Sequence, residues 1–382
     1  MHGRHAGFLD LASSESPRCT HAAPHRSGWL FALSCLLLSF LLDPQPVWAQ
    51  DPLPVEDPLP VELPEGFTIQ LVASDELVHD AFCMTLDPAG RPVISGPAYL
   101  RTLVDTDGDG RFDKGIPWTG AIRQGAQGLW AEGKYRFWVA DGGLWRSADN
   151  NGDLVADTPP EKLLALTTGG EHHAHAIRRG PDGWWYLMAG NHAEGIQRLK
   201  SDGDAAIPVA RAGTLWRISP DFQRRGVVAH GLRNAYDFDF LPDGQPVTYD
   251  SDGERDITLP WYRPTRILVL SPGSDAGWIG ECSRDPDYRF LMPRTLASLG
   301  RGSPTGVAVY QHSRFPSKYQ GAILALDWTF GRILAVYPER VAVSADHPDA
   351  KRLRLGAETF LKSTGSAGFA ATDLVVEPSG SL

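Results

Sequence analysis

One short pattern recurs along the chain: an apolar stretch, a tight turn rich in Pro, Asp or Gly, and a second apolar stretch. In such turns Pro presets φ, Asp caps the turn and Gly accepts a positive φ. The copies are spaced by about 45 to 75 residues, which is typical of the blades of a β-propeller with loop insertions. Clear copies lie at residues 86–94, 179–187, 241–248 and 376–382, and looser ones at 129–141 and 319–326.

Six copies predict an all-β, six-bladed β-propeller over residues 65–382. A pair of β-sandwiches is the alternative, but it gives no reason for one hairpin to recur at blade spacing. The sequence stops at Leu382, directly after the last turn, so we expect an incomplete last blade and a C-terminally truncated propeller. Residues 67–72 are a candidate outer strand for closing that blade.

The first 64 residues predict export rather than a folded domain. An apolar run at 29–42 follows a basic stretch and precedes Val47-Trp48-Ala49, a small-residue pattern typical of a signal-peptidase site. We therefore assign a signal peptide to residues 1–49, with an uncleaved membrane anchor as the alternative; either leads to a periplasmic or secreted domain. Residues 50–64 form a Pro-rich linker, in which Asp-Pro-Leu-Pro-Val-Glu occurs twice in succession.

Composition and charge limit the fold class and the kinds of partner that the chain can bind. Forty Gly, thirty Pro and twelve Trp favour many short strands joined by turns. The net charge of −10, with no Lys/Arg-rich patch, argues against nucleic-acid binding. Outside the leader only Cys83 and Cys282 remain; export permits a disulfide between them, and two buried free thiols are the alternative. No Cys-x-x-Cys-His is present, so the chain carries no c-type haem site.

Two acidic loops predict calcium binding. Each places carboxylate or amide oxygens at alternating positions around a Gly bend, and Ca²⁺ needs several such oxygens at about 2.3–2.6 Å. The position-12 Glu and the flanking helices of an EF-hand are absent, so we expect structural ions between strands, with solvated Asp/Gly turns as the alternative. A third, less regular cluster lies at 250–256. The expected ligands are Asp105, Asp107, Asp109 and Asp113 in the first loop and Asp149, Asn151, Asp153 and Asp157 in the second.

Three imidazoles lie close together at His172, His173 and His175. Histidine changes charge nearest to neutral pH, which suits it to accepting a proton or ligating a metal. A Pro-Asp-Gly turn and the strand expected at 184–188 follow at once, so the imidazoles lie next to a rigid sheet. This is a plausible place for chemistry.

Arg233 precedes its own Leu-Pro-Asp-Gly turn just as the histidines precede theirs. Equivalent loops of successive blades open at the same end of a propeller, so we expect Arg233 and His172 to face one funnel. A guanidinium suits a carboxylate or a developing oxyanion, and an arginine that bridges blades is the alternative. Arg266 and Arg332, which stand near aromatic residues, are further candidates, with inter-blade packing as their alternative.

At this point the residues resemble a known family. Glu171-His172 before Gly180-Pro181-Asp182-Gly183, with Gly231-Leu232-Arg233-Asn234 later, resembles the soluble quinoprotein glucose/sorbosone dehydrogenase propellers. Further segments are similar to bacterial proteins named membrane-bound dehydrogenases, whose larger members add helical repeats and a haem domain not found here. These segments are 249–252, 260–266, 272–278, 302–306 and 326–331.

The resemblance implies a mechanism. His172 would be the general base that takes the proton of a substrate hydroxyl, and a hydride would pass to bound pyrroloquinoline quinone (PQQ). Arg233 would polarise a quinone carbonyl, Asn234, Arg332 and Arg266 would hold the cofactor, and Ca²⁺ would lie nearby. The substrate would be a sugar or an alcohol, with a separate cytochrome as electron acceptor.

Two classes of function therefore remain open. The first is a Ca²⁺-dependent quinoprotein dehydrogenase. The second is a propeller without catalysis that binds a ligand or partner. A calcium-dependent lactonase-type hydrolase, with an axial ion held by acidic ligands, is a third possibility.

Overall fold

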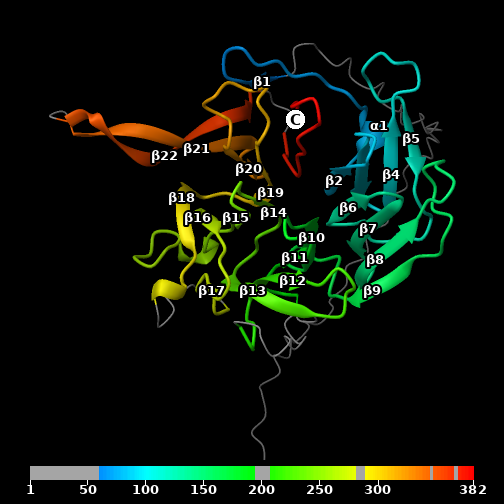
Figure 1. Cartoon of the computed structure of the whole chain (residues 1–382), viewed down its shortest axis with the longest axis horizontal. Coiled ribbons are helices and arrows are strands. Elements are labelled where there is room, and N and C mark those ends of the chain that lie inside the picture. The colour runs from blue at the N-terminus through cyan, green and yellow to red at the C-terminus, as the bar shows by residue number, and fades with distance from the viewer. Residues whose placement is uncertain (1–59, 194–206, 281–288, 345–346, 365–368) are drawn as a thin grey trace, which may run out of the picture. The chain divides into compact units, whose positions relative to one another are not determined.

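The computed structural model describes residues 60–193, 207–280, 289–344, 347–364 and 369–382. These residues form almost only β-strands; helical turns occur at α1 (Asp75–Val78), η1 (Glu254–Asp256) and η2 (Arg289–Leu291). The strands make five sheets, which Figure 1 shows arranged around a common centre. The predicted all-β propeller is confirmed.

Each sheet is built mainly from strands that follow one another in the chain and pair antiparallel. The first contains β2 (Cys83–Leu86), β3 (Pro92–Gly96), β4 (Tyr99–Val104) and β5 (Lys114–Pro117). The second contains β6 (Leu129–Glu132), β7 (Tyr135–Ala140), β8 (Gly143–Ala148) and β9 (Glu161–Ala165). The third contains β10 (Ala174–Arg179), β11 (Trp185–Ala189), β12 (Gly213–Ile218), β13 (Arg225–Leu232) and β17 (Ser274–Asp275), which pairs parallel with β13.

The fourth sheet contains β14 (Phe238–Phe240), β15 (Pro246–Asp250), β16 (Thr265–Val269) and β18 (Arg294–Gly300). The fifth contains β19 (Pro304–Val309), β20 (Ile323–Asp327), β21 (Arg332–Ser344), β22 (His347–Ser363) and the short edge strand β1 (Val61–Glu62).

The recurring turn joins the first two strands of every sheet. Gly183 and Gly244 have φ of 77° and 83°, a region that only glycine enters without strain. Asp182 accepts a hydrogen bond from the Trp184 backbone N–H at 3.0 Å, so the carboxylate caps the turn. Five of the six copies in the sequence thus mark one structural position, the connection between the first two strands of a sheet.

The prediction of six blades is wrong, because five sheets are present in the described residues. The sixth copy does form its turn, in which the Gly380 N–H donates to the Glu377 carbonyl at 2.8 Å. No ladder of strands accompanies it there. Residues 369–377 instead run between the fifth and first sheets: the Gly306 N–H donates to the Thr372 carbonyl at 2.9 Å.

The N-terminal part of the described chain also packs on the fifth sheet. The edge strand there is β1, in which Val61 pairs with Ser363, and not residues 67–72 as expected. Phe67 instead packs its ring edge-on against Phe315 at 4.7 Å and Phe360 at 5.0 Å between ring centroids. Both ends of the described chain therefore lie against the fifth sheet.

Apolar layers between successive sheets hold the ring together. Trp118 and Trp138 are fully buried between the first and second sheets, and Trp185 and Trp216 between the second and third. Each buried side chain of this size contributes about 1.5–3 kcal/mol of transfer free energy. The indole N–H of Trp216 donates to Thr214 Oγ1 at 2.9 Å, so its burial leaves no polar group unpaired.

The predicted signal peptide, residues 1–49, and residues 50–59 of the predicted linker lie outside the described residues. Within the described part of the chain, no helix is long and apolar enough to cross a membrane.

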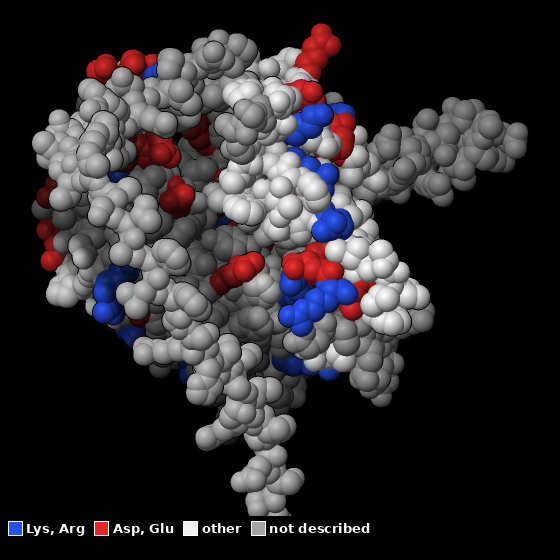
Figure 2. Space-filling view, turned by 180° about the vertical axis from the view of Figure 1, so that it is seen from behind, with Lys and Arg blue, Asp and Glu red and all other residues white. Residues whose placement is uncertain are grey.

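Cys83 is a buried free cysteine whose Sγ donates to the Ala126 carbonyl at 3.2 Å, while Cys282 lies outside the described residues. Figure 2 shows Lys and Arg side chains lying next to Asp and Glu over the described surface of one face.

Candidate functional site

The predicted base and the predicted arginine meet at one end of the third sheet. His172 lies in the loop just before β10, and Arg233 directly follows β13. Asn191, two residues after β11, connects them: its backbone N–H donates to the Arg233 carbonyl at 2.9 Å, and its side-chain amide lies 2.5 Å from His172 Nδ1. Antiparallel pairing brings the start of β10 and the ends of β11 and β13 to the same end of the sheet.

The orientation of the Asn191 amide decides the tautomer of His172. With the amide nitrogen toward His172 Nδ1, that nitrogen also donates to the Arg233 carbonyl at 3.0 Å, and the amide oxygen accepts from Trp278 Nε1 at 3.1 Å. The opposite orientation would point the amide oxygen at the Arg233 carbonyl and the amide nitrogen at the Trp278 N–H, and neither contact is a hydrogen bond. The favoured arrangement makes Nδ1 an acceptor, so a neutral His172 carries its proton on Nε2.

The surroundings also keep the His172 ring neutral. Its side chain is 12 % exposed, and burial lowers its pKa, with the nearby positive charge of Arg233 acting in the same direction. Glu171 lies 3.9 Å from Nε2 and opposes this effect. His192 stacks on the ring with 4.8 Å between centroids. A neutral imidazole is the form needed to accept a proton.

Arg233 is held by contacts on both its backbone and its side chain. Its guanidinium Nη1 lies 3.1 Å from Ser251 Oγ and 3.1 Å from Glu254 Oε1, and packs over the Trp278 ring. Its backbone N–H donates to Asp250 Oδ1 at 3.1 Å. The irregular acidic cluster at 250–256 thus contributes to this site.

Asp250 anchors the loop from within the protein. It is 1 % exposed, and burial raises its pKa while Arg266, 3.6 Å away, lowers it. The backbone N–H of Asn234 donates to the same carboxylate at 3.1 Å. Arg266, predicted to hold a cofactor, is therefore ion-paired to this buried carboxylate.

Asn234 is buried and supports the histidine loop. Its Nδ2 donates to the Glu171 carbonyl at 3.3 Å. A Cβ at Gly190 would lie 2.4 Å from Asn234 Oδ1 and 2.7 Å from the His172 carbonyl oxygen, so only glycine fits at this crossing. Asn234 thus lies beside His172, but its side chain contacts the peptide groups of the histidine loop.

The two extra imidazoles serve the same loop. His175 is fully buried, and its Nε2 donates to the Glu171 carbonyl at 2.8 Å. Burial lowers its pKa to about 4, so the ring is neutral at pH 7. His173 Nδ1 accepts from the Gly170 backbone N–H at 2.9 Å. Both rings therefore form hydrogen bonds within the loop that carries His172.

Arg332 belongs to another sheet. It begins β21, and its guanidinium pairs with Asp327 at 2.9 Å and packs over the Phe330 ring. The structure thus groups His172, Arg233 and Asn234, links Arg266 to them through Asp250, and places Arg332 in a separate ion pair.

Sequence reasoning missed Asn191, His192 and Trp278. Asn191 and His192 directly follow the Ala-Gly that ends the strand at 185–189, where polar residues at a strand end are a usable signal. Trp278 ends the 272–278 segment and carried no such signal, because its contact with Asn191 depends on the path of a separate loop.

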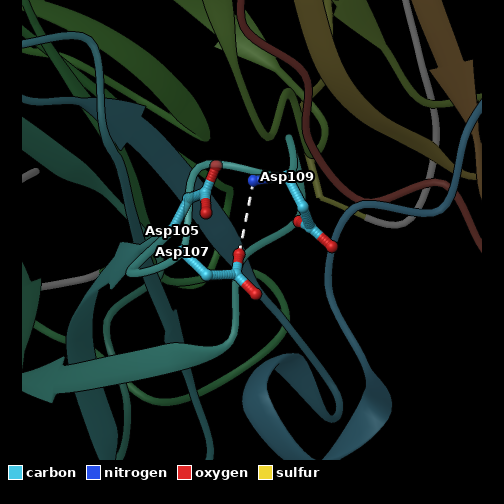
Figure 3. A group of neighbouring side chains, drawn as sticks. All are labelled: Asp105, Asp107 and Asp109. Atoms are coloured by element: carbon cyan, nitrogen blue, oxygen red, sulfur yellow. Dashed lines mark hydrogen bonds between the residues drawn. The ribbon is translucent and has the colours of Figure 1, made fainter.

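The two predicted calcium loops occupy equivalent places, between the third and fourth strands of the first and second sheets. In the first loop, Asp105 accepts from the backbone N–H groups of Gly108 at 2.7 Å and Gly110 at 2.9 Å. Asp105, Asp107 and Asp109 each offer an oxygen within 4.8 Å of the others (Figure 3). Asp113 accepts from the Thr106 N–H at 3.1 Å at the closing end of the loop.

The second loop folds in the same way. Asp149 accepts from the N–H groups of Gly152 at 2.6 Å and Leu154 at 2.9 Å. Asn151 Nδ2 donates to Asp153 at 3.1 Å and to Asp157 at 3.3 Å, so its amide bridges two predicted ligands. The loop therefore closes on hydrogen bonds of its own.

Comparisons with known proteins support the fold. A family described as a domain of unknown function, DUF7133, matches residues 56–245. No curated protein matches the chain. The chain resembles an oxidoreductase described as a glucose dehydrogenase from Thermus thermophilus at 19 % identity and a TM-score of 0.55, covering 84 % of this chain and 91 % of that one.

Two fungal structures are also similar. The PQQ domain of a pyranose dehydrogenase from Coprinopsis cinerea is 12 % identical with a TM-score of 0.58, covering 84 % of this chain and 92 % of its own. A carbohydrate-active enzyme from Trichoderma reesei, in its calcium structure, is 12 % identical with a TM-score of 0.58, covering 85 % and 94 %. At these identities the likeness establishes the propeller fold.

Proposed function

We propose that the chain is an exported dehydrogenase of sugars or alcohols, with His172 and Arg233 at the reacting end of a PQQ and calcium site. The observation that carries this proposal is that Asn191 bonds both the His172 ring and the backbone carbonyl of Arg233, 61 positions further along the sequence. Trp278, which donates to the Asn191 amide, packs against the Arg233 guanidinium. The printed names of the similar structures, which include dehydrogenases and a PQQ domain, agree with this chemistry. We also propose membership of the bacterial membrane-bound dehydrogenase propellers.

The donor set next to Arg233 fits a calcium-bound quinone. Asp252 Oδ1 is buried and has no hydrogen-bond partner among the described residues, while Oδ2 accepts from Tyr262 at 2.7 Å. Burial raises the pKa of this carboxyl, as expected for an oxygen that lacks a positive neighbour at contact distance. Asp252 and Glu254 would hold the divalent cation, and Arg233 a carbonyl or carboxylate oxygen.

The quinone, when bound, supplies a two-electron acceptor for a hydride. This chain's own contribution is positioning and proton transfer. His172 Nε2 can take the proton of a substrate hydroxyl only when the ring's other proton is on Nδ1. This requires Asn191 to turn its oxygen toward the ring, so the amide orientation controls whether His172 acts as a base.

A propeller without catalysis is the second candidate, and one observation favours it. The favoured amide orientation places the His172 proton on Nε2, so this nitrogen cannot accept one from a substrate. The Arg233 guanidinium is also already paired with Glu254. The lactonase-type reading is not supported, because a guanidinium occupies the centre of the ring: Arg178 pairs there with Asp237 at 2.7 Å.

Reconstitution tests the proposal. The purified protein is given Ca²⁺ and PQQ and assayed for dye reduction with a panel of sugars and alcohols. His172→Ala should lower turnover about 10²- to 10⁴-fold, the usual contribution of a general base. His79→Ala, which removes an imidazole packed on Tyr99 in the first sheet, is the matched control and should keep full activity. A folded protein without turnover would support the binding propeller instead.

The predicted roles of Asn234, Arg266 and Arg332 remain part of the proposal. Asn234 and Arg266 would act by holding the loop, through Glu171 and Asp250. Arg332 would reach a cofactor only by leaving Asp327. A separate cytochrome is proposed as the final electron acceptor.

A further inference from the structure

A cavity lies at the opposite end of the third sheet from His172. The strand β10 runs from Ala174, beside the histidine loop, to Arg179 at this cavity, a distance of about 17 Å for six extended residues. The cavity has a volume of about 370 Å³, within the usual range of small-ligand sites. Its lining is Glu132, Gly133, Lys134, Tyr135, Phe137, Arg146, Arg179, Trp185, Pro220 and Phe222.

One wall is made of aromatic rings held in a strained arrangement. Phe222 has φ of +58°, a left-handed conformation that a bulky side chain rarely adopts. The Ser219 Oγ accepts from the backbone N–H of Arg224 at 2.8 Å and thereby fixes the turn. In this conformation the Phe222 ring stacks on Trp185 at 5.8 Å and on Phe137 at 6.4 Å between centroids. Such strain persists at binding sites more often than elsewhere.

The charges of the lining are unbalanced. Three cations, Lys134, Arg146 and Arg179, face one carboxylate, Glu132, in a chain whose net charge is −10. Arg179 packs over the Trp185 ring at 4.5 Å and lies 3.7 Å from Glu132.

The other two cations lie around a single ring. Lys134 and Arg146 lie over the Tyr135 ring at 5.6 and 5.1 Å. Arg146 pairs at 2.6 Å with Glu161, whose side chain is 58 % exposed. Exposed ion pairs of this kind are weak, so a ligand anion can replace the protein's own carboxylate.

We propose that this cavity binds a sugar acid, a ring compound that bears both a carboxylate and hydroxyl groups. The carboxylate would lie between Arg146 and Lys134, in place of Glu161 beside Arg146 and of Asn150, whose Oδ1 accepts from Lys134 at 2.8 Å. The apolar face of the sugar ring would pack on Phe222, and Glu132 would accept hydroxyl hydrogens. An aromatic acid without hydroxyl groups offers no donor to Glu132, and a neutral sugar offers no anion to the two cations. This site is independent of the proposed dehydrogenase chemistry.

Binding is measured by calorimetry on the whole protein, with D-galacturonate, D-galactose and benzoate as probes. We expect galacturonate to bind at least tenfold more tightly than galactose or benzoate, and more weakly as salt is added. Arg146→Gln and Lys134→Gln should each weaken binding of galacturonate about tenfold, the usual effect of losing one charge-assisted hydrogen bond.

Arg217→Gln is the matched control. Arg217 is also an exposed arginine in an ion pair, with Asp182 at 2.6 Å, and lies over the Trp184 ring at 4.2 Å, but it does not line the cavity. This variant should bind galacturonate like the wild type. The proposal is overturned by absence of binding, by equal affinity for galactose or benzoate, or by equal losses in Arg217→Gln and Arg146→Gln. Circular dichroism confirms that each variant is folded.

Discussion

Replacing Asp373 by Asn should change how stability depends on pH. Asp373 lies at the centre of the ring, where it accepts from the Met84 N–H at 2.8 Å. It lines a cavity of about 10 Å³, room for one water, together with Arg178, Asp237 and Cys83. Two carboxylates of this lining, Asp237 and Asp373, share the guanidinium of Arg178. Arg178 already donates two hydrogen bonds to Asp237, one to each carboxylate oxygen.

The magnitude follows from the pKa of Asp373. Burial, together with the negative charge of Asp237, raises it from 3.8 to about 7. Because the folded-state pKa lies above the unfolded one, this group's stabilising contribution is complete below pH 4 and is lost as pH rises toward 7. From pH 5 to pH 8 the loss is on the order of 3 kcal/mol, since each pH unit below the folded pKa counts about 1.4 kcal/mol.

Asp373→Asn removes the ionisation and keeps an oxygen for the Met84 N–H. Relative to wild type, the free energy of unfolding of the variant should therefore rise by about 3 kcal/mol from pH 5 to pH 8. Urea unfolding followed by tryptophan fluorescence at both pH values measures this difference, in which other titrating groups such as His175 cancel. Asp243→Asn, in the exposed turn before β15, is the matched control, because it makes the same substitution away from Arg178 and Asp237. A constant difference for Asp373→Asn, or one of opposite sign, would refute the reasoning.

Three further outcomes are expected. Trp216→Ala should lower the free energy of unfolding by about 3–5 kcal/mol in urea titrations, because it empties a fully buried site between two sheets. Added Ca²⁺ should raise the melting temperature of the wild type more than that of Asp105→Asn, and equal shifts would argue against an ion in the first loop. In ¹⁵N NMR the wild-type His172 should carry its proton on Nε2, whereas Asn191→Asp should move it to Nδ1 and raise the pKa of the ring; an unchanged tautomer would contradict the amide assignment.

The fold could be predicted from the sequence wherever the turn residues themselves determine the structure. Gly183 and Gly244 adopt the positive φ that their Pro-Asp-Gly turns predict, and each turn opens a sheet. The number of blades was not readable, because residues 376–382 form the same turn without a ladder. Whether a turn is followed by paired strands depends on long-range partners, which the turn residues do not specify.

The candidate site was readable only in part. The approach of the loops that carry His172 and Arg233 was predictable, because both residues precede a recognisable turn. Asn191 was not found, although it sets the tautomer, because its relation to His172 exists only once β10 and β11 pair. Arg332 looked equivalent to Arg266 in sequence, but its guanidinium is paired with Asp327 in another sheet.

The approach of the loops that carry His172 and Arg233 depends on buried hydrogen-bond acceptors rather than on exposed polar side chains. The Glu171 carbonyl receives hydrogen bonds from His175 and Asn234, and the Asp250 carboxylate receives the backbone N–H groups of Arg233 and Asn234. These bonds join the loop before β10, the end of β13 and the end of β15, so that loops of two adjacent sheets are held together. A site held in this way is preorganised by its supporting shell, and its reacting side chains can change without loss of the geometry. For this reason we expect the backbone arrangement of positions 172 and 233 to survive replacement of either side chain, but not the loss of Asp250.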